Sequence, residues 1–241
     1  MGTVEITRFS SPDSLAQAAA TQWLDQLGRI EPDAAPYCVA LAGGRIAGRF
    51  FRAAAQSAKA RGANLEAVHF FWGDERCVPP DDADSNYKLA WDTLLGPLGV
   101  PLKRIHRVRG EDPPEKAAAS ATEELKRIAR RGEQGQPLLD LVFLGIGEEG
   151  HTASLFPGEP ANVNDSEQVY RVVTASPKPP PRRITLGYAT LAAAREVWLL
   201  ASGEGKEKVL RESLAPEGQT PCARVLRLRP HTRVLTDLLG P

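Results

Sequence analysis

His151 has the residue type and the neighbours that proton-transfer chemistry requires. It follows a glycine-rich turn, Gly145 to Gly150, and stands two residues after Glu149. A histidine titrates near neutral pH, so it can take a proton from water, and a nearby carboxylate can orient the ring and favour its charged form. On these residues alone, a catalytic base and a purely structural imidazole both remain open.

The other three histidines lack this context. His69 and His106 fall within segments that we predict to be strands, where a histidine is more often a buried, hydrogen-bonded residue than a catalyst. His231 follows Pro230 near the end of the chain. His151 is therefore the histidine that we expect to act as a base.

Three cations accompany it in the sequence. Arg76 closes the turn Gly73-Asp74-Glu75-Arg76, and an arginine can hold a phosphate through two parallel hydrogen bonds. Lys178 and Arg183 flank the stiff run Pro179 to Pro181. Each of the three is a candidate for an anionic substrate, and each is equally compatible with a solvated surface charge.

A second glycine turn, Gly43-Gly44, precedes a segment that we predict to be a helix. Glycines let the backbone approach a ligand closely, and a helix N-terminus offers free N–H groups to an anion. The turn is not a Walker loop, because Arg49-Phe50 occupies the positions of the lysine and the serine or threonine. A simple tight turn is the alternative.

Gly145 to Gly150 also fits the pattern G-x-G-x-x-G of dinucleotide sites, and Asp165 lies at the distance expected for the acidic partner. Glu148 and Glu149 would repel a pyrophosphate, however, and Pro157 leaves room for only a short helix. We therefore expect no nucleotide cofactor.

Metal and nucleophile motifs are missing from the sequence. It contains no HExxH, no EF-hand pattern and no G-x-S-x-G. Cys38, Cys77 and Cys222 have no ligand-like spacing, which argues against both a zinc site and a disulfide scaffold and fits a reducing, cytoplasmic setting. We expect neither a metal nor another cofactor.

Alternating strands and helices must position these turns. Apolar runs predict strands at 37–42, 68–72, 105–108, 138–144, 169–174, 197–201 and 234–236. Helical spacing or composition predicts helices at 11–27, 45–59, 85–95, 114–131 and 204–214. The order predicts a mostly parallel sheet covered on both faces, in a single domain over residues 1–241. Ligands bind beyond the carboxyl ends of such strands, so the three turns are expected to form one composite site.

Composition excludes several classes of protein. The 241 residues carry 30 Lys plus Arg and 30 Asp plus Glu, a balance that argues against a general nucleic-acid binder. No apolar run approaches the roughly 20 residues of a membrane span, and the first residues lack a signal-peptide core. We expect a cytoplasmic protein whose partner is a small molecule, as a monomer or small homo-oligomer, with neither membrane nor nucleic acid bound.

Four segments together resemble the 6-phosphogluconolactonase family. They are LAGG at 41–44, FFWGDERCVPPDDADSNY at 70–87, LDLVFLGIGEEGHTASLFPG at 139–158 and PKPPPRRITL at 177–186. The stretch GHTASLFPG is the most specific of these, followed by GDER with DSNY.

The resemblance implies a Rossmann-like three-layer αβα sandwich and hydrolysis of 6-phospho-D-glucono-1,5-lactone in the oxidative pentose phosphate pathway. His151 would be the general base and Glu149 its orienting partner. Asp74 would contact the substrate or order its loop. The remaining residues expected to bind the substrate, most of them through its phosphate, are Gly43, Gly44, Arg45, Arg76, Lys178 and Arg183.

Two positions depart from the family pattern. Arg45-Ile46-Ala47 replaces a hydroxyl-rich stretch, so an extra guanidinium is available to the phosphate. Glu149 stands where the family usually has aspartate, and the added methylene shifts the orienting contact to His151 or removes it.

Two alternatives share the expected fold. Glucosamine-6-phosphate deaminase resembles the chain, but its ring-opening glutamate aligns with Phe156, which does not titrate. A non-catalytic sugar-phosphate sensor would keep the cations and lose the base, and the presence of His151 argues against it.

Overall fold

A computed structural model describes residues 3–30, 35–132, 135–160 and 167–238. Its centre is a six-stranded sheet in the order β1-β11-β10-β7-β2-β3, with every neighbouring pair parallel. The strands are β1 (Thr3–Arg8), β2 (Tyr37–Leu41), β3 (Val68–Trp72), β7 (Leu141–Leu144), β10 (Glu196–Ala201) and β11 (His231–Thr236). The predicted α/β class is therefore confirmed, and β1 is a strand that the sequence patterns missed.

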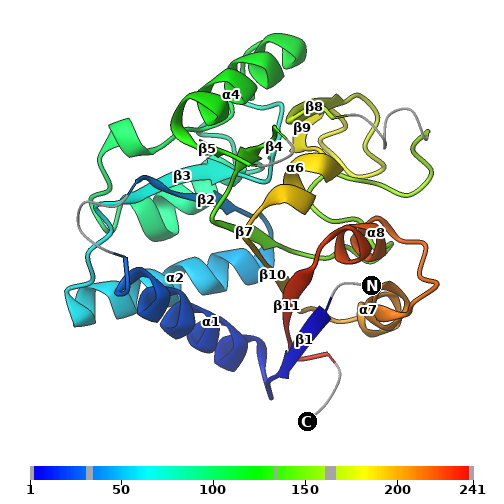
Figure 1. The fold of residues 1–241 in the computed structure, drawn as a ribbon, viewed down its shortest axis with the longest axis horizontal. Coiled ribbons are helices and arrows are strands. Elements are labelled where there is room, and N and C mark those ends of the chain that lie inside the picture. The colour runs from blue at the N-terminus through cyan, green and yellow to red at the C-terminus, as the bar shows by residue number, and fades with distance from the viewer. Residues whose placement is uncertain (1–2, 31–34, 133–134, 161–166, 239–241) are drawn as a thin grey trace.

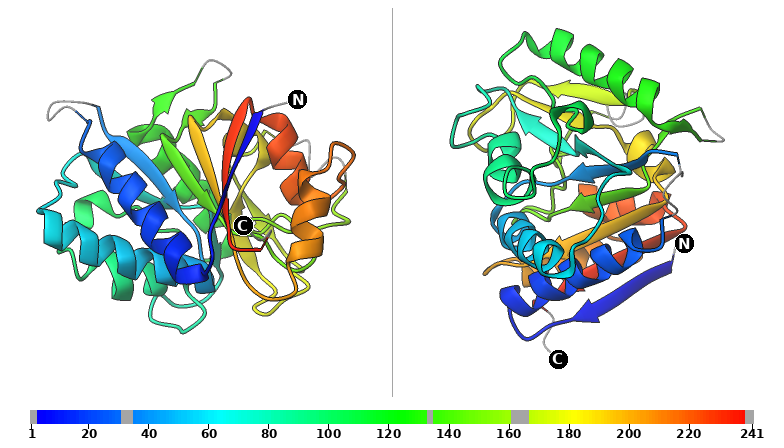
Figure 2. Two further views of the ribbon diagram at one scale, coloured as in Figure 1. Left: turned by 90° about the horizontal axis from the view of Figure 1, so that it is seen from below. Right: turned by 90° about the vertical axis from the view of Figure 1, so that its left-hand side faces the viewer.

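Helices cover both faces of this sheet, as Figures 1 and 2 show. One face carries α1 (Pro12–Leu27) and α2 (Arg45–Arg61), and the other carries α7 (Glu207–Leu214) and α8 (Pro221–Leu228). Ser11 caps α1 by accepting a hydrogen bond from the Ser14 backbone N–H at 3.1 Å. The three layers agree with the expected sandwich, although α8 was not predicted.

A smaller antiparallel sheet lies beside the main one. Its order is β4 (Asp74–Arg76), β9 (Arg183–Leu186) and β8 (Tyr170–Val173), and α4 (Pro114–Ile128) packs against it. The remaining elements are α3 (Asn86–Ala90), a π-helix (Trp91–Leu95), a 3₁₀ turn (Leu102–Arg104), β5 (Arg130–Arg131), β6 (Pro137–Leu138) and α6 (Tyr188–Ala193). This small sheet brings Asp74, Arg76 and Arg183 together, because Arg76 pairs with Arg183 across β4 and β9.

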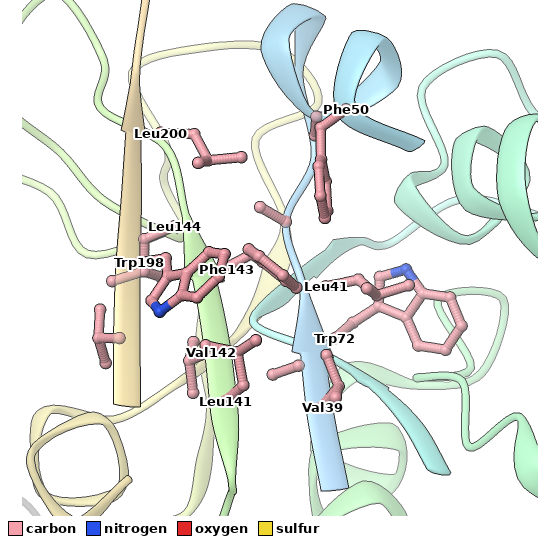
Figure 3. Packing of buried hydrophobic residues seen from close by; sticks show 14 of the residues in the cluster. Val39, Leu41, Phe50, Trp72, Leu141, Val142, Phe143, Leu144, Trp198 and Leu200 are labelled. Atoms are coloured by element: carbon pink, nitrogen blue, oxygen red, sulfur yellow. The ribbon is translucent and has the colours of Figure 1, made fainter. Parts of the chain in front are cut away.

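Aromatic side chains fill the core between β7 and its neighbours. Figure 3 shows Phe143 between Trp198 of β10 and Leu41 of β2. The Phe143 ring packs edge-on against Trp198 at 5.7 Å and lies 4.5 Å from the Phe50 ring of α2. Each buried side chain of this size contributes roughly 1.5–3 kcal/mol, so the core fixes the central strands and the turns that follow them.

Two of the predicted strands need correction. The segment at 105–108 is not a strand: only Ile105 forms a bridge, to Phe70, and His106 lies in irregular structure. The run at 138–144 is divided between β6 and β7, because Asp140 accepts a hydrogen bond from the Cys38 backbone N–H at 2.9 Å and interrupts the ladder.

The predicted helix at 85–95 consists of α3 followed by the π-helix. No helix in the part of the chain that the structure describes is both long enough and apolar enough to cross a bilayer.

Candidate active site

The carboxyl ends of β2, β3, β7 and β10 open onto a cavity of about 850 Å³. Eight of the nine predicted site residues line it: Gly43, Gly44, Arg45, Asp74, Arg76, His151, Lys178 and Arg183. The ninth, Glu149, contacts two of these residues from the side. The three turns thus meet at one edge of the sheet, as the strand order requires.

The loop after β7 holds the His151 ring in place. A Cβ at Gly147 would stand 2.0 Å from both Cε1 and Nδ1 of His151, so only glycine leaves room for the ring. The Gly147 backbone N–H donates to the His151 carbonyl at 2.9 Å, and the Thr152 hydroxyl donates to the Gly145 carbonyl at 2.9 Å. The Phe156 ring covers one side of the imidazole, with ring centroids 4.8 Å apart.

Glu149 lies between His151 and Lys178. Its Oε1 is 3.1 Å from His151 Nδ1, and its Oε2 is 3.2 Å from Lys178 Nζ. The contact with the ring has the distance of an ion pair but not the alignment of a hydrogen bond. Among the described residues none forms a hydrogen bond with the other ring nitrogen, Nε2, which is therefore the nitrogen available to a ligand.

Burial and charge act in opposite directions on this histidine. Burial lowers the pKa of His151 below 6.5, and the nearby carboxylates of Glu149 and Asp74 oppose the shift without reversing it. Partial burial acts to raise the pKa of Glu149, but its own backbone N–H and the positive charges of His151 and Lys178 outweigh it, so that pKa is lowered. At neutral pH the ring is therefore a neutral base beside a carboxylate.

The Gly43-Gly44 turn ends in an uncapped helix. Gly44 has a φ of 92°, a conformation that favours glycine, and no side chain caps the first turn of α2. Gly43, Gly44, Arg45 and Ile46 line the cavity, so the N-terminus of α2 borders it together with the Arg45 side chain, an arrangement suited to an anion.

Lys206 joins this cationic group, and the sequence analysis missed it. Arg45, Lys178 and Lys206 all line the cavity, and burial together with the charges of Arg45 and Lys178 lowers the pKa of Lys206. The turn before α7 follows β10 at the same edge of the sheet, so the rule that selected the other turns also points to Lys206.

Arg76 and Arg183 face the cavity from the small sheet. Arg76 donates to the Asp84 carbonyl at 2.6 Å, and no described residue accepts a hydrogen bond from its buried Nε. Arg183 is buried and donates to the carbonyls of Lys178, Pro179 and Pro180 at 3.1, 3.2 and 3.1 Å. Arg183 thus fixes the segment that carries Lys178, while Nε of Arg76 has no acceptor among the described residues.

Asp74 connects the small sheet to the histidine loop. Its Oδ2 accepts a hydrogen bond from the Ser154 hydroxyl at 2.6 Å, and the Ser154 backbone N–H donates to Thr185 Oγ1 at 3.1 Å. Ala153, just before it, has a φ of 48°, a strained conformation for alanine. Asp74 therefore orders the loop that carries His151.

The alternative sites find little support. Residues 151–160 form turns, not the helix that a dinucleotide fold requires, and Asp165 lies outside the described residues. Within the described ranges no three His, Cys, Asp or Glu side chains gather as metal ligands.

Comparison with known proteins places the chain in a family. The model for glucosamine-6-phosphate isomerases/6-phosphogluconolactonase matches residues 10–235. A human 6-phosphogluconolactonase is 36% identical over 231 residues, covering 94% of this chain and 87% of its own length. A probable chloroplastic 6-phosphogluconolactonase from rice (Oryza sativa) is 34% identical over 213 residues; the match covers 86% of this chain but only 64% of the rice protein.

Solved structures agree with this placement. The structure of 6-phosphogluconolactonase from Trypanosoma brucei superposes with a TM-score of 0.86 at 29% identity, covering 99% of this chain and 98% of that one. The chain belongs to the 6-phosphogluconolactonase family, within the larger group that also contains the glucosamine-6-phosphate isomerases.

Proposed function

We propose that this protein hydrolyses 6-phospho-D-glucono-1,5-lactone to 6-phosphogluconate, with His151 as the general base. Family membership supports the reaction class. The observation that carries the mechanism is a neutral imidazole whose Nε2 is free, set at the edge of a cavity in which Lys and Arg outnumber acidic residues among the described lining residues.

The reaction needs one proton to move twice. Nε2 of His151 takes a proton from water as the water oxygen attacks C1 of the lactone, and the carbonyl becomes an oxyanion. When the oxyanion collapses, the bond between C1 and the ring oxygen breaks, and the imidazolium returns the proton to that oxygen. The product is an open-chain acid with a new hydroxyl, and the base is restored.

Glu149 supports the charged intermediate. Its carboxylate lies beside Nδ1, so it stabilises the imidazolium that forms after proton transfer. Lys178, on the far side of Glu149, limits this effect by sharing the negative charge.

The phosphate is assigned to the first turn of α2 and the cations beside it. Burial and the charges of Arg45 and Lys178 lower the pKa of Lys206, and a dianionic phosphate would relieve that repulsion. Arg76 and Arg183, which also line the cavity, would add positive charge beside the sugar. Anchoring the distant phosphate would hold C1 near His151.

Disappearance of the lactone, corrected for spontaneous hydrolysis, tests the reaction directly. We expect rapid hydrolysis of the phosphorylated lactone and a much lower kcat/KM for the unphosphorylated one, with no deamination of glucosamine 6-phosphate. Lys206→Ala should raise KM about tenfold or more, the loss typical of a charged hydrogen bond. Lys208→Ala, which removes an exposed lysine from the first turn of the adjoining helix α7, is the matched control. No acceleration of lactone hydrolysis would refute the proposal.

A further inference from the structure

Asn86 occupies a central place in the cavity that the mechanism above does not use. The residue is 2% exposed and lines the cavity between the Gly43-Gly44 turn and Asp74. Its side-chain NH₂ donates to the Asp74 carbonyl at 2.8 Å and to Asp74 Oδ1 at 3.3 Å. Because a carbonyl and a carboxylate only accept hydrogen bonds, the amide must point its NH₂ at Asp74.

This orientation turns the other amide atom, Oδ1, toward Gly43. A Cβ at Gly43 would stand 1.9 Å from that oxygen, so the glycine leaves the space that Oδ1 occupies. Among the residues that the structure describes, none donates a hydrogen bond to Asn86 Oδ1. A carbonyl oxygen in a cavity that is without a donor is a ready acceptor for a ligand.

Glu75 fixes the backbone from which this side chain projects. Its buried carboxylate accepts the backbone N–H groups of Arg76, Asn86 and Tyr87 at 2.8, 2.8 and 2.7 Å, and the Ser85 hydroxyl at 3.2 Å. Burial raises the pKa of Glu75 to about 7, and the three backbone N–H groups oppose that rise. Asn86 is thus held on both its backbone and its side chain before any ligand binds.

The charge around Oδ1 selects the kind of group that can meet it. An amide oxygen next to the Asp74 carboxylate repels a phosphate, which has the cations of α2 and α7 to bind instead. A hydroxyl can donate a hydrogen bond there without bringing negative charge.

From this geometry we infer that Asn86 is a specificity-determining residue whose Oδ1 accepts a hydrogen bond from a hydroxyl of the bound sugar. The inference rests on the proposed function in that the ligand is taken to be a phosphorylated sugar lactone or its acid. Glu75 acts through Asn86 as a positioning residue and does not contact the ligand.

The test is a binding comparison that needs no catalysis. Dissociation constants for 6-phosphogluconate and its 2-, 3- and 4-deoxy derivatives are measured by calorimetry on the wild type, Asn86→Ala and Asn64→Ala. We expect Asn86→Ala to bind 6-phosphogluconate about three- to tenfold more weakly, the loss typical of one neutral hydrogen bond. For the derivative lacking the contacted hydroxyl, wild type and variant should bind equally.

The controls separate contact from positioning. Asn64 lies on the surface, where its side chain accepts only a local backbone hydrogen bond, so Asn64→Ala should change none of the constants. Glu75→Gln should weaken binding of the ligands that keep the contacted hydroxyl, by a smaller factor than Asn86→Ala, and should leave the derivative without it unchanged, because Glu75 acts only through the position of Asn86. If Asn86→Ala folds poorly, the wild-type series still decides: equal affinity for all four ligands would overturn the inference.

The outcomes also distinguish this inference from the proposed function. An equal loss of affinity for every ligand in Asn86→Ala, or no loss, overturns the role of Asn86 even if the wild type hydrolyses the lactone. The expected pattern in a protein without lactonase activity would uphold Asn86 and refute the reaction. A wild type that binds none of the four ligands overturns the inference as well.

Discussion

Among the described residues, the two histidine–carboxylate pairs with a largely buried imidazole are His106–Glu124 and His151–Glu149, and their surroundings differ; the pair His231–Glu5 is exposed. His106 Nδ1 lies 2.7 Å from Glu124 Oε1, and its Nε2 lies 2.8 Å from Nδ1 of His69, so both of its ring nitrogens are engaged. The His151 ring has a poorly aligned carboxylate 3.1 Å from its Nδ1, and its Nε2 forms no hydrogen bond with a residue that the structure describes. Both ring nitrogens of His106 are already hydrogen-bonded, whereas His151 keeps one ring nitrogen that can bind and transfer a proton.

Position in the fold explains the contrast. His69 lies within β3, at an edge of the main sheet, and its ring is nearly coplanar with that of His106, with centroids 5.1 Å apart; the Phe71 ring stacks on His106 at 4.6 Å. His151 follows β7, where the carboxyl ends of the central strands form the cavity. A histidine beside a carboxylate is therefore not by itself a sign of catalysis; a free ring nitrogen at the open end of a parallel sheet is the stronger sign.

The largest expected difference between the pairs is in turnover. His151→Ala should lower kcat by about 10²- to 10⁴-fold with little change in KM, since it removes the general base and leaves the phosphate site intact. Steady-state kinetics of lactone hydrolysis measure the effect, and His106→Ala should keep the wild-type kcat. Activity of His151→Ala within threefold of wild type would remove it from this role.

The free energy of unfolding should be affected in the reverse order, more by His106→Ala than by His151→Ala. His106→Ala removes two partly buried hydrogen bonds, one of them to His69, so we expect the free energy of unfolding to fall by about 1–3 kcal/mol. His151→Ala should cost less, because its ring makes no hydrogen bond to a described residue. Urea denaturation of both variants makes the comparison, and equal losses would mean that the two clusters are equally structural.

The two carboxylates should differ in their effect on the pH profile. Glu149 raises the pKa of His151, so Glu149→Gln should lower that pKa further and move the acidic limb of kcat/KM to lower pH. Loss of the stabilising charge should also reduce kcat/KM about three- to tenfold. Glu124→Gln should leave the limb in place. A shift of the limb to higher pH in Glu149→Gln would contradict this assignment.

The smallest expected effect is a decrease of stability in acid that originates in His69 and His106. Burial lowers the pKa values of His69 and His106 below 6.5 in the folded protein, so as the pH falls below 6.5 the unfolded chain binds protons that the folded chain does not. The free energy of unfolding should therefore decrease below pH 6.5. His69→Gln, measured by denaturation at pH 7 and pH 5.5, should weaken this decrease; an unchanged slope would exclude His69 as its source.

Sequence patterns predicted the buried strands better than the exposed ones. Val68–Trp72 was predicted to the residue although β3 lies at an edge of the main sheet, because nearly all of its side chains are buried and its pattern is mostly apolar. β1 was missed because its edge position leaves most of its side chains exposed. β9 was missed because it follows a proline-rich run and begins at an arginine.

The missed site residues were polar residues without a distinctive local pattern. Lys206 stands between a strand and a helix that were both predicted, but no ligand was inferred for that turn. Asn86 belongs to the stretch DSNY, which supported the family resemblance without indicating a role. Their importance depends on neighbours such as Gly43 and Asp74 that are distant in sequence.

The sequence alone determined the α/β class, the turns that bear the site, and His151 as the histidine most suited to catalysis. Those features follow from local hydrophobic patterns and from the rule that parallel strands direct their carboxyl ends to one edge. Only the tertiary structure decided which atoms remain free. Burial and hydrogen-bond saturation are set by contacts between distant segments, and they left Nε2 of His151 and Oδ1 of Asn86 available while engaging both nitrogens of His106.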